Sequence, residues 1–423
     1  MEGGSENQWS DWERRGGIKS GDCCGLACDW WKNAERDFDL ARDIGVNALR
    51  LSVEWGRIEP QQNHFDSAAL SRYRQMLEGL RRRGIEPFVS LHHFSHPRWF
   101  EEKGAFLHAD APQVFERFTR RVVQALGDLC RYWVTFNEPN VYATHGYVTG
   151  EFPPGQKGQV ATSLRVMSAQ GRSHVRAYHA IHELQPDAQV GWAQHYVVFD
   201  PVRGGLDRWI ASLQSQIFNE GFLQLMEQGR FNFPLNLADG AVGGIRGACD
   251  FVGLNVYSRF RVAFDLKSAG QLFGRVFVPP DVPQGDPGVE KPYGEAYPAA
   301  IRYAVQRAAR LRKPIYILEN GVPDAQDRLR SWLITNAVRE VYSLIAEGYD
   351  VRGYFHWTLT DNFEWAEGWR LRFGLVALDP VTQERTMRGS GRLYGEIVKQ
   401  NRLARAVIEA YNTPPDGTPS AKR

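Results

Sequence analysis

Residues 134–140 read Val-Thr-Phe-Asn-Glu-Pro-Asn, an apolar run that ends abruptly in the carboxylate of Glu138. Proline lacks the amide hydrogen that a sheet ladder needs, so Pro139 ends the strand directly after this acid. Proline also disfavours helical geometry in the residue before it, and we expect an extended backbone at Glu138. The stretch therefore predicts a buried strand that carries a glutamate at its carboxyl end.

A second stretch has the same form. Residues 313–321 read Lys-Pro-Ile-Tyr-Ile-Leu-Glu-Asn-Gly, so a short apolar run again ends in an acid, Glu319, and Gly321 allows the backbone to turn. Glu138 and Glu319 are far apart in the chain. Only a closed or strongly wound sheet could bring the two strand ends together, and the pair predicts such a sheet.

Composition bounds the class of protein. The 423 residues are 43% hydrophobic and 24% charged, which suits a globular chain with a large core. The 51 basic and 49 acidic residues give a formal net charge of +2, so no strong field favours nucleic acid or an anionic membrane as a partner. No run approaches the roughly 20 apolar residues of a membrane span, and the polar, acidic residues 1–12 are unlike a secretory signal. We expect a cytoplasmic protein.

The five cysteines are few and odd in number, which argues against a disulfide framework. Cys23, Cys24 and Cys28 lie close together, so a metal site there is conceivable, but no histidine lies among them. We therefore expect neither a metal site nor a cofactor.

Along the chain, helical spacing of apolar residues alternates with short apolar runs that follow turn residues. The expected helices are residues 32–44, 66–83, 111–126, 163–184, 206–227, 299–311, 329–346 and 390–401. The expected strands are residues 46–53, 85–91, 130–136, 189–195, 250–256, 314–318 and 352–357. Residues 265–296 are rich in proline and glycine and are expected to form a long loop.

This alternation predicts parallel strands covered by helices, and the commonest closed form of that α/β arrangement is the (β/α)8 TIM barrel. We expect it as a single domain over residues 1–423. The pattern contains only seven strands, because the polar, glycine-rich residues 1–20 ahead of the first helix make a poor strand. The first strand is expected to be irregular or missing, and a barrel without it would expose two unpaired edges.

In such a barrel the chemistry lies at the carboxyl ends of the strands, where each apolar run stops. The residues at these ends are Arg50, Glu54, His92, His93, Asn137, Glu138, His195, Asn255, Tyr257, Glu319 and Trp357, and Glu364 and Trp365 follow the last strand. Aromatic rings can stack on the faces of sugars, and amides and carboxylates can bind sugar hydroxyls. Glycoside hydrolysis needs two carboxylates that flank one glycosidic bond.

Four motifs carry a family resemblance: Thr-Phe-Asn-Glu-Pro at 135–139, Ile-Leu-Glu-Asn-Gly at 317–321, Asp-Asn-Phe-Glu-Trp at 361–365 and Arg-Phe-Gly-Leu at 372–375. In this order and spacing they closely resemble glycoside hydrolase family 1, the β-glucosidases and β-galactosidases. The resemblance runs from about residue 2 to residue 401. It implies a retaining exo-β-glycosidase that hydrolyses β-D-glucosides, with β-galactosides or β-fucosides accepted as well, through a covalent glycosyl-enzyme intermediate.

By this resemblance Glu138 is the acid/base and Glu319 the nucleophile. Arg50 and Tyr257 are expected to orient Glu319 and lower its pKa, whereas the pKa of the acid/base is expected to be raised so that it can donate its proton. The implied sugar-binding residues are His93, Asn137, Tyr257, Trp357, Glu364 and Trp365. His92, His195 and Glu54 are interpreted as structural.

Two of these residues also bear on the substrate. Glu364 would accept hydrogen bonds from the sugar 4- and 6-hydroxyls, and its charge would repel a phosphorylated sugar. Glu138 stands where the thioglucosidase branch has a glutamine, so the resemblance implies O-glycosides.

One departure concerns the first strand. In the family this strand ends in a glutamine that binds the sugar 3- and 4-hydroxyls, with Glu-Gly following shortly, but here residues 1–3 already read Met-Glu-Gly. We expect weaker sugar binding and a barrel opened between its first and last remaining strands. Two alternatives stay open: a sugar-binding homologue with weakened or lost turnover, and a transglycosylase that passes the same intermediate to a sugar hydroxyl.

Overall fold

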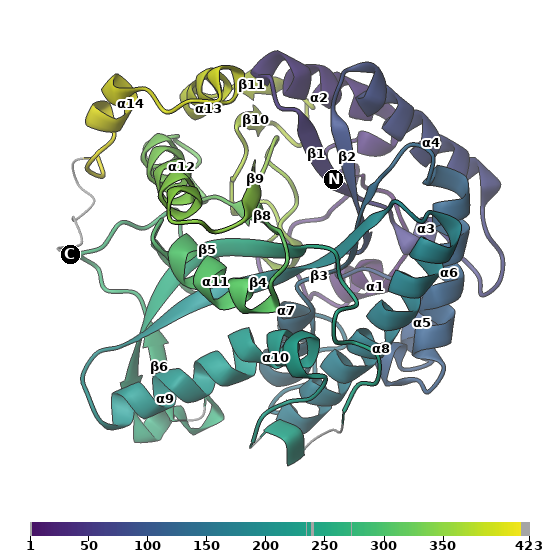
Figure 1. Ribbon diagram of the computed structural model, residues 1–423, viewed down its shortest axis with the longest axis horizontal. Coiled ribbons are helices and arrows are strands. Elements are labelled where there is room, and N and C mark those ends of the chain that lie inside the picture. The colour runs from purple at the N-terminus through teal and green to yellow at the C-terminus, as the bar shows by residue number, and fades with distance from the viewer. Residues whose placement is uncertain (1, 234, 238–240, 272, 416–423) are drawn as a thin grey trace.

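The fold is built on a sheet of parallel strands. The computed structural model describes residues 2–233, 235–237, 241–271 and 273–415. Seven strands follow one another in the order β1-β2-β3-β4-β5-β8-β9 (Figure 1). Their bounds are β1 Ala48–Ser52, β2 Glu86–His92, β3 Tyr132–Asn137, β4 Gln189–Pro201, β5 Val252–Phe264, β8 Ile315–Asn320 and β9 Val351–His356. Every expected strand is present, and the predicted barrel fold is confirmed.

Helices surround the sheet. The α-helices are α1 Gln8–Arg14, α2 Trp30–Ile44, α3 Trp55–Ile58, α4 Ser67–Arg82, α5 Arg98–Glu102, α6 Ala111–Leu126, α7 Pro139–Thr144, α8 Val160–Leu184, α9 Leu206–Ser215, α10 Gly221–Gln228, α11 Ala300–Ala308, α12 Arg330–Ala346, α13 Gly389–Gln400 and α14 Arg405–Ala410. Short helices of the 3-10 or π type are η1 Ala105–Leu107, η2 His145–Thr149, η3 Gln216–Glu220, η4 Leu235–Leu237, η5 Leu266–Gln271, η6 Ala309–Leu311 and η7 Trp365–Glu367. The helix expected over 206–227 is divided by the π-helical turn η3. Within the described part of the chain, none of the helices combines the length and apolar character that crossing a bilayer requires.

Large side chains fill the interior of the barrel below its carboxyl ends. Phe88 of β2 stacks on Tyr132 of β3, with ring centroids 4.2 Å apart. Its edge contacts are Phe355 of β9 at 5.0 Å and Tyr316 of β8 at 5.4 Å. Close packing of this kind leaves little freedom, so the strand ends above it are held in fixed positions.

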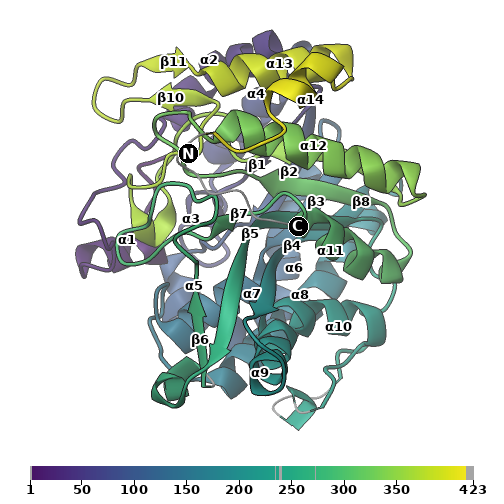
Figure 2. The same ribbon diagram turned by 90° about the vertical axis from the view of Figure 1, so that its left-hand side faces the viewer.

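The long loop expected over residues 265–296 contains further strands, so that expectation is wrong in part. β5 continues to Phe264 and pairs antiparallel with β6 (Gly274–Phe277), and β7 (Glu295–Ala296) pairs with β5 as well. The physical reason is the alternation of Arg259 and Arg261 with apolar neighbours, which lets β5 extend beyond the barrel with one polar face. Figure 2 shows this extension beside α9, at the opposite side from α13. A separate two-stranded sheet joins β10 (Val376–Leu378) to β11 (Arg385–Met387).

The barrel is open between β1 and β9. Among the described residues each of these strands has a single parallel neighbour, β2 or β8, and the order of the sheet ends at both. A cavity of about 1330 Å³ lies there, lined by Leu49 and Leu51 of β1 and by Tyr354 and Phe355 of β9. The expected opening between the first and last remaining strands is confirmed.

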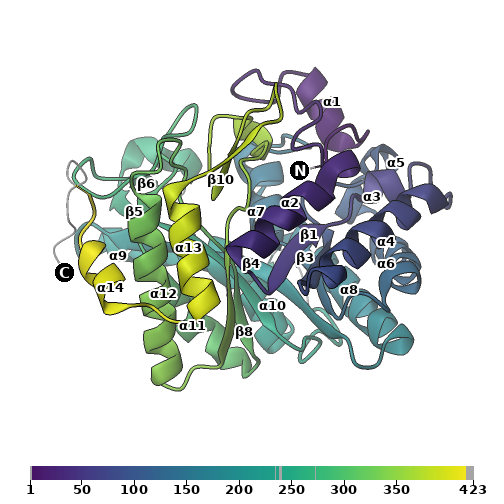
Figure 3. The same ribbon diagram turned by 90° about the horizontal axis from the view of Figure 1, so that it is seen from above.

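The outer layer of helices continues across this opening. α13 contacts α2 on one side and α12 on the other (Figure 3). Ile44 of α2, Ile334 of α12, and Tyr394 and Ile397 of α13 form one apolar cluster. The helices therefore hold the two strand edges in place although the sheet itself does not close.

The residues ahead of α2 were expected to be unsuited to forming a strand. They include the helix α1. Asn7 caps α1 and accepts hydrogen bonds from the backbone N–H groups of Trp9 and Ser10. Gln8 and Trp9 donate side-chain hydrogen bonds to the carbonyl oxygen of Phe94, at 2.8 and 3.0 Å. This helix is thereby docked against the loop that follows β2.

Candidate active site

Glu138 lies where β3 passes directly into α7. Its backbone has φ 45° and ψ 62°, in the left-handed region, so the expectation that Pro139 forces it into an extended conformation is wrong. Pro139 is the first residue of α7, where a missing N–H is tolerated, and the N–H of Glu138 still donates to the carbonyl oxygen of Ala193 on β4 at 2.7 Å. A non-glycine residue held in this region costs on the order of 1–3 kcal/mol, and such strain is concentrated at functional sites.

The Glu138 carboxyl is buried and is held by side chains of β4 and β5. Its Oε1 accepts a hydrogen bond from Nδ2 of Asn255 on β5 at 2.8 Å. The same oxygen lies 2.9 Å from Nδ1 of His195 on β4. His195 was interpreted as structural, and Asn255 had no assigned role, so both are residues that sequence reasoning missed. A lone histidine at the end of a strand carries no signal that would have revealed this contact.

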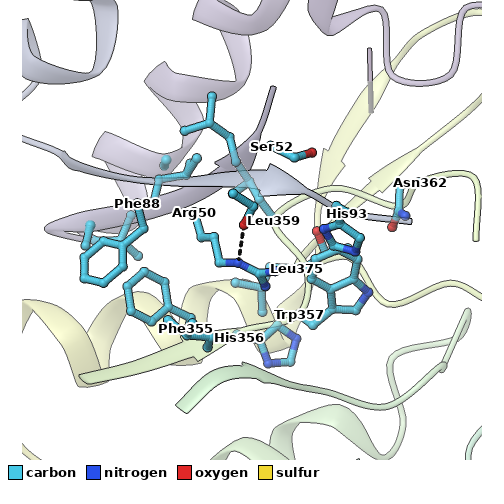
Figure 4. Close-up of a pocket in the computed structure, with 18 of the residues that line it drawn as sticks. Arg50, Ser52, Phe88, His93, Phe355, His356, Trp357, Leu359, Asn362 and Leu375 are labelled. Carbon is cyan, nitrogen blue, oxygen red and sulfur yellow. Dashed lines mark hydrogen bonds between the residues drawn. The ribbon is translucent and has the colours of Figure 1, made fainter. Parts of the chain in front are cut away.

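Glu319 lies at the end of β8 and is held by a cation and a phenol. Nη1 of Arg50, on β1, pairs with one oxygen of its carboxylate, and the Tyr257 hydroxyl donates to the other at 2.6 Å. Arg50 is itself fixed, because its Nε donates to Oγ of Ser90 at 3.0 Å (Figure 4). The structure thus brings Arg50 and Tyr257 to the acid that they were predicted to orient.

One hydrogen-bonded network joins the two acids. Oδ1 of Asn137 accepts from Nη2 of Arg50 at 2.5 Å and from Nδ2 of Asn255 at 3.0 Å. Arg50 in turn contacts Glu319, and Asn255 contacts Glu138. Two glutamates that are distant in the sequence therefore converge on a single site at the carboxyl ends of the strands.

The pKa shifts of the two acids in the free protein are the reverse of those expected. Burial raises the pKa of Glu319 above its ordinary 4.5; Arg50 and Tyr257 lower it, but burial and the charge of Glu138 outweigh them. Burial would also raise the pKa of Glu138, but the His195 charge and the hydrogen bonds from His195 and Asn255 outweigh burial and hold the value below 4.5. The expected direction is wrong for Glu319 because burial and the charge of Glu138 outweigh Arg50 and Tyr257, and it is wrong for Glu138 because the contact with His195 was not foreseen.

Aromatic residues and a third acid form the adjoining wall. Nε2 of His93 accepts from Nδ2 of Asn137 at 3.0 Å, and burial holds the pKa of His93 well below its usual range, so the ring is neutral. Its ring centroid lies 5.9 Å from that of Trp357 (Figure 4). It lies 5.7 Å from that of Trp365. Trp357 donates from Nε1 to Glu364 at 2.9 Å, and burial raises the pKa of Glu364 to about 7. A wall of indoles with a few polar groups is typical of a small-molecule site.

The cavity in the barrel opening reaches this wall. Its lining includes Arg50, His93 and Trp357 (Figure 4). Trp365 and the two strand edges line it as well. The opening therefore lies directly beside the residues predicted to bind a sugar. Among the described residues, no group of three or more histidine, cysteine or acidic side chains could hold a metal ion.

Comparisons with known proteins place this geometry in context. The sequence profile of glycosyl hydrolase family 1 matches residues 1–403. Beta-glucosidase A of Thermotoga maritima is 30% identical over 412 residues, which cover 92% of this chain and 90% of that protein. A beta-galactosidase of Pyrococcus woesei is 26% identical over 478 residues, with 96% and 94% covered. The solved beta-glycosidase from Pyrococcus horikoshii has a TM-score of 0.88 and 31% identity, and the match covers 99% of this chain and 95% of that one.

Proposed function

Because the chain belongs to glycosyl hydrolase family 1, we propose that it is a retaining exo-β-glycosidase that hydrolyses β-D-glucosides and also accepts β-galactosides or β-fucosides. The observation that carries this function is the network through which Arg50, Asn137 and Asn255 join the carboxyls of Glu138 and Glu319. Two acids facing one hollow are what glycoside cleavage requires. The relatives named above include both a beta-glucosidase and a beta-galactosidase, which supports the breadth of the sugar class.

In the first step, the Glu319 carboxylate attacks the anomeric carbon and the bond to the glycosidic oxygen breaks. Glu138 gives its proton to that oxygen, so the aglycone leaves as a neutral alcohol. Arg50 and Tyr257 orient the attacking carboxylate, and their hydrogen bonds to it support this role. The product of the step is a glycosyl ester of Glu319.

In the second step, water attacks the anomeric carbon from the side of Glu138, which now accepts the proton of the water. The ester bond breaks and the Glu319 carboxylate is restored. Each step inverts the anomeric carbon, so the β configuration is retained overall.

The sugar would lie against the aromatic wall. We assign stacking to Trp357 and Trp365, and hydrogen bonds to sugar hydroxyls to His93, Asn137 and Glu364. The hydrogen bonds that link Asn137 to His93, and Glu364 to Trp357, support these assignments because they hold the polar groups in fixed orientations. A buried acid that is protonated near neutral pH can both donate and accept, and Glu364 has that character.

Two broader features belong to the same proposal. The whole chain would form one catalytic domain, which is supported by an apolar core that includes residues from Trp9 to Leu378. A cytoplasmic location is supported by the small, odd number of cysteines.

Release of p-nitrophenol from p-nitrophenyl β-glucoside tests the activity directly. Steady release that depends on Glu138 and Glu319 supports the hydrolase. Thermal stabilisation by glucose with no release would instead indicate a sugar-binding protein, and glucosyl transfer to added alcohol at the expense of hydrolysis would indicate a transglycosylase.

Azide distinguishes the roles of the two acids by stereochemistry. In Glu319→Ala, azide would enter the space left by the nucleophile and give an α-glucosyl azide. In Glu138→Ala with a good leaving group, the ester would still form, and azide would attack it to give a β-glucosyl azide. If the two variants gave each other's product, the nucleophile and acid/base roles of Glu319 and Glu138 would be reversed. If azide rescued neither variant, neither role would be supported.

A further inference from the structure

His195 is a buried titratable residue with no part in the mechanism just described. It lies at the carboxyl end of the barrel portion of β4, opposite Asn255 of β5 in the register of the sheet. Its backbone carbonyl accepts hydrogen bonds from the side chains of Asn140 and Gln194, both at 3.0 Å. The backbone at this position is therefore fixed.

The ring of His195 is also fixed by its neighbours. It stacks on Tyr257, with centroids 5.7 Å apart and planes at 23°, and the edge of Phe218 packs against it at 5.7 Å. Nδ1 then meets the Glu138 carboxyl at 2.9 Å, and the two side chains are only 15% and 7% exposed. A carboxylate can only accept a hydrogen bond, so Nδ1 carries the hydrogen in this contact.

We propose that His195 is a positioning residue for Glu138, which fixes the carboxyl through Oε1 and keeps the acid/base proton on the His195–Glu138 pair to a higher pH than a lone carboxyl would. The inference rests on the proposed function, because it concerns the acid/base of that reaction. It leaves the second carboxyl oxygen for the glycosidic oxygen of the substrate.

A single proton can reside on this pair in two ways. In one form a neutral acid lies beside a neutral imidazole, and in the other a carboxylate lies beside an imidazolium. The neutral-acid form is the one that reacts, and the imidazolium form is its reservoir. Because both forms contribute, the last proton leaves the pair at a higher pH than it would leave Glu138 beside a neutral amide.

The surrounding charges act in the same direction. Burial alone would lower the pKa of His195, but the charge of Glu138, the hydrogen bond to Glu138 and the charge of Glu319 together outweigh burial, and the pKa lies above the ordinary 6.5. The other titratable groups that face the ring are the Tyr257 phenol, which burial keeps protonated, and His145 of η2, whose pKa burial lowers to about 4. Both are uncharged near neutral pH, so Glu138 and Glu319 decide the charge of His195. The pair holds its proton below the raised pKa and loses it as the pH rises through that value.

His195→Gln separates the two roles, because glutamine can still donate a hydrogen bond but cannot take a proton. We would measure kcat/KM from pH 4 to 10 with two substrates, an alkyl β-glucoside that needs the acid and 2,4-dinitrophenyl β-glucoside that does not. For the alkyl glucoside, the alkaline limb of the variant should lie about one pH unit lower than in the wild type. At pH values above that limb, kcat/KM of the variant should therefore be about tenfold lower than that of the wild type. At the plateau, activity on the activated substrate should stay within about twofold, since glycosylation by Glu319 needs no proton there.

His182→Gln is the matched control. His182 forms a similar contact, 2.8 Å from Nε2 to Asp250, away from the two catalytic acids. It should leave both limbs of the profile where they are. A shift of the alkaline limb in this control equal to that in His195→Gln would show that loss of a histidine–carboxylate pair acts through the fold, and would overturn the inference.

The wild-type protein gives a second, mutation-free readout. Titration of its ¹⁵N-labelled histidines by NMR should show one ring that stays protonated beyond pH 6.5 and changes with the alkaline limb. An alkaline limb unmoved or raised in His195→Gln, or a His195 ring that is neutral throughout the active range, would overturn the inference while leaving the hydrolase intact. Absence of cleavage by the wild type would instead overturn the proposed function.

Discussion

The substitution Tyr257→Phe tests how the nucleophile is kept ionised. The Tyr257 hydroxyl donates to Glu319 at 2.6 Å, and the two residues are 5% and 3% exposed. Burial raises the pKa of this phenol well above its usual range, so it remains a donor at every working pH. Phenylalanine would keep the ring and its packing on Phe373 and Tyr293, so the change removes the donor alone.

The expected magnitude follows from the charge on the acceptor. A hydrogen bond to a charged group contributes about 1.5–3 kcal/mol, and one pKa unit corresponds to about 1.4 kcal/mol. Loss of the donor destabilises the carboxylate form, so the pKa of Glu319 should rise by about 1–2 units above its already raised value. Activity requires the ionised nucleophile, and the acid limb of kcat/KM should therefore move up by about 1–2 pH units.

The assay is the pH dependence of kcat/KM for p-nitrophenyl β-glucoside from pH 4 to 9. The released p-nitrophenol is measured in samples in which the reaction has been stopped. The matched control is Tyr293→Phe, because Tyr293 is a tyrosine that packs edge-on against Tyr257 at 5.9 Å. The control should leave the acid limb within about 0.3 pH unit of the wild type. An acid limb that stays in place, or moves down, in Tyr257→Phe would refute the role given to this hydroxyl.

Three further predictions follow from the site and the open barrel. In the wild type, kcat/KM should fall on the acid side with a midpoint above pH 4.5, because burial raises the pKa of Glu319 and activity is lost as the pH falls through it; a midpoint below 4.5 would contradict this. Glu364→Gln removes an acid from the sugar wall and should raise KM for a β-glucoside at least about tenfold, and an unchanged KM would remove Glu364 from the binding site. A strand-forming apolar segment of about six residues fused ahead of residue 2 should pair with β1 and β9, raise Tm by several degrees and lower KM. The same segment interrupted by proline lacks N–H donors and should gain nothing, so equal gains from both would exclude pairing.

The barrel could be predicted from the sequence because buried parallel strands are short apolar runs with abrupt ends. Residues 314–318 were expected as a strand and lie largely in β8, and residues 130–136 lie largely in β3. The count of seven barrel strands among the described residues could also be predicted, since residues 1–29 contain no apolar run that would form a strand. These features depend on local pattern, which a sequence displays directly.

Other features depend on contacts between strands and could not be predicted. The left-handed backbone of Glu138 arises because α7 begins at Pro139 while the Glu138 N–H donates a hydrogen bond to β4. The local sequence pattern predicts neither the helix nor that hydrogen bond. The pairing of Glu138 with His195 depends on the alignment of β3 with β4, which includes a register shift after Val134. The lowered pKa of Glu138 follows from that contact, and the raised pKa of Glu319 follows from burial and the charge of Glu138, so the local sequence pattern could not predict either shift.

Trapping of the covalent intermediate tests the central claim most directly. An activated 2-deoxy-2-fluoro-β-glucoside should form the glycosyl ester and release it slowly, because the fluorine disfavours the oxocarbenium-like transition state. The account predicts release of one equivalent of aglycone and, by mass spectrometry of the digested protein, a single sugar adduct on Glu319. An adduct on another carboxylate, Glu138 included, or turnover without any adduct, would contradict it.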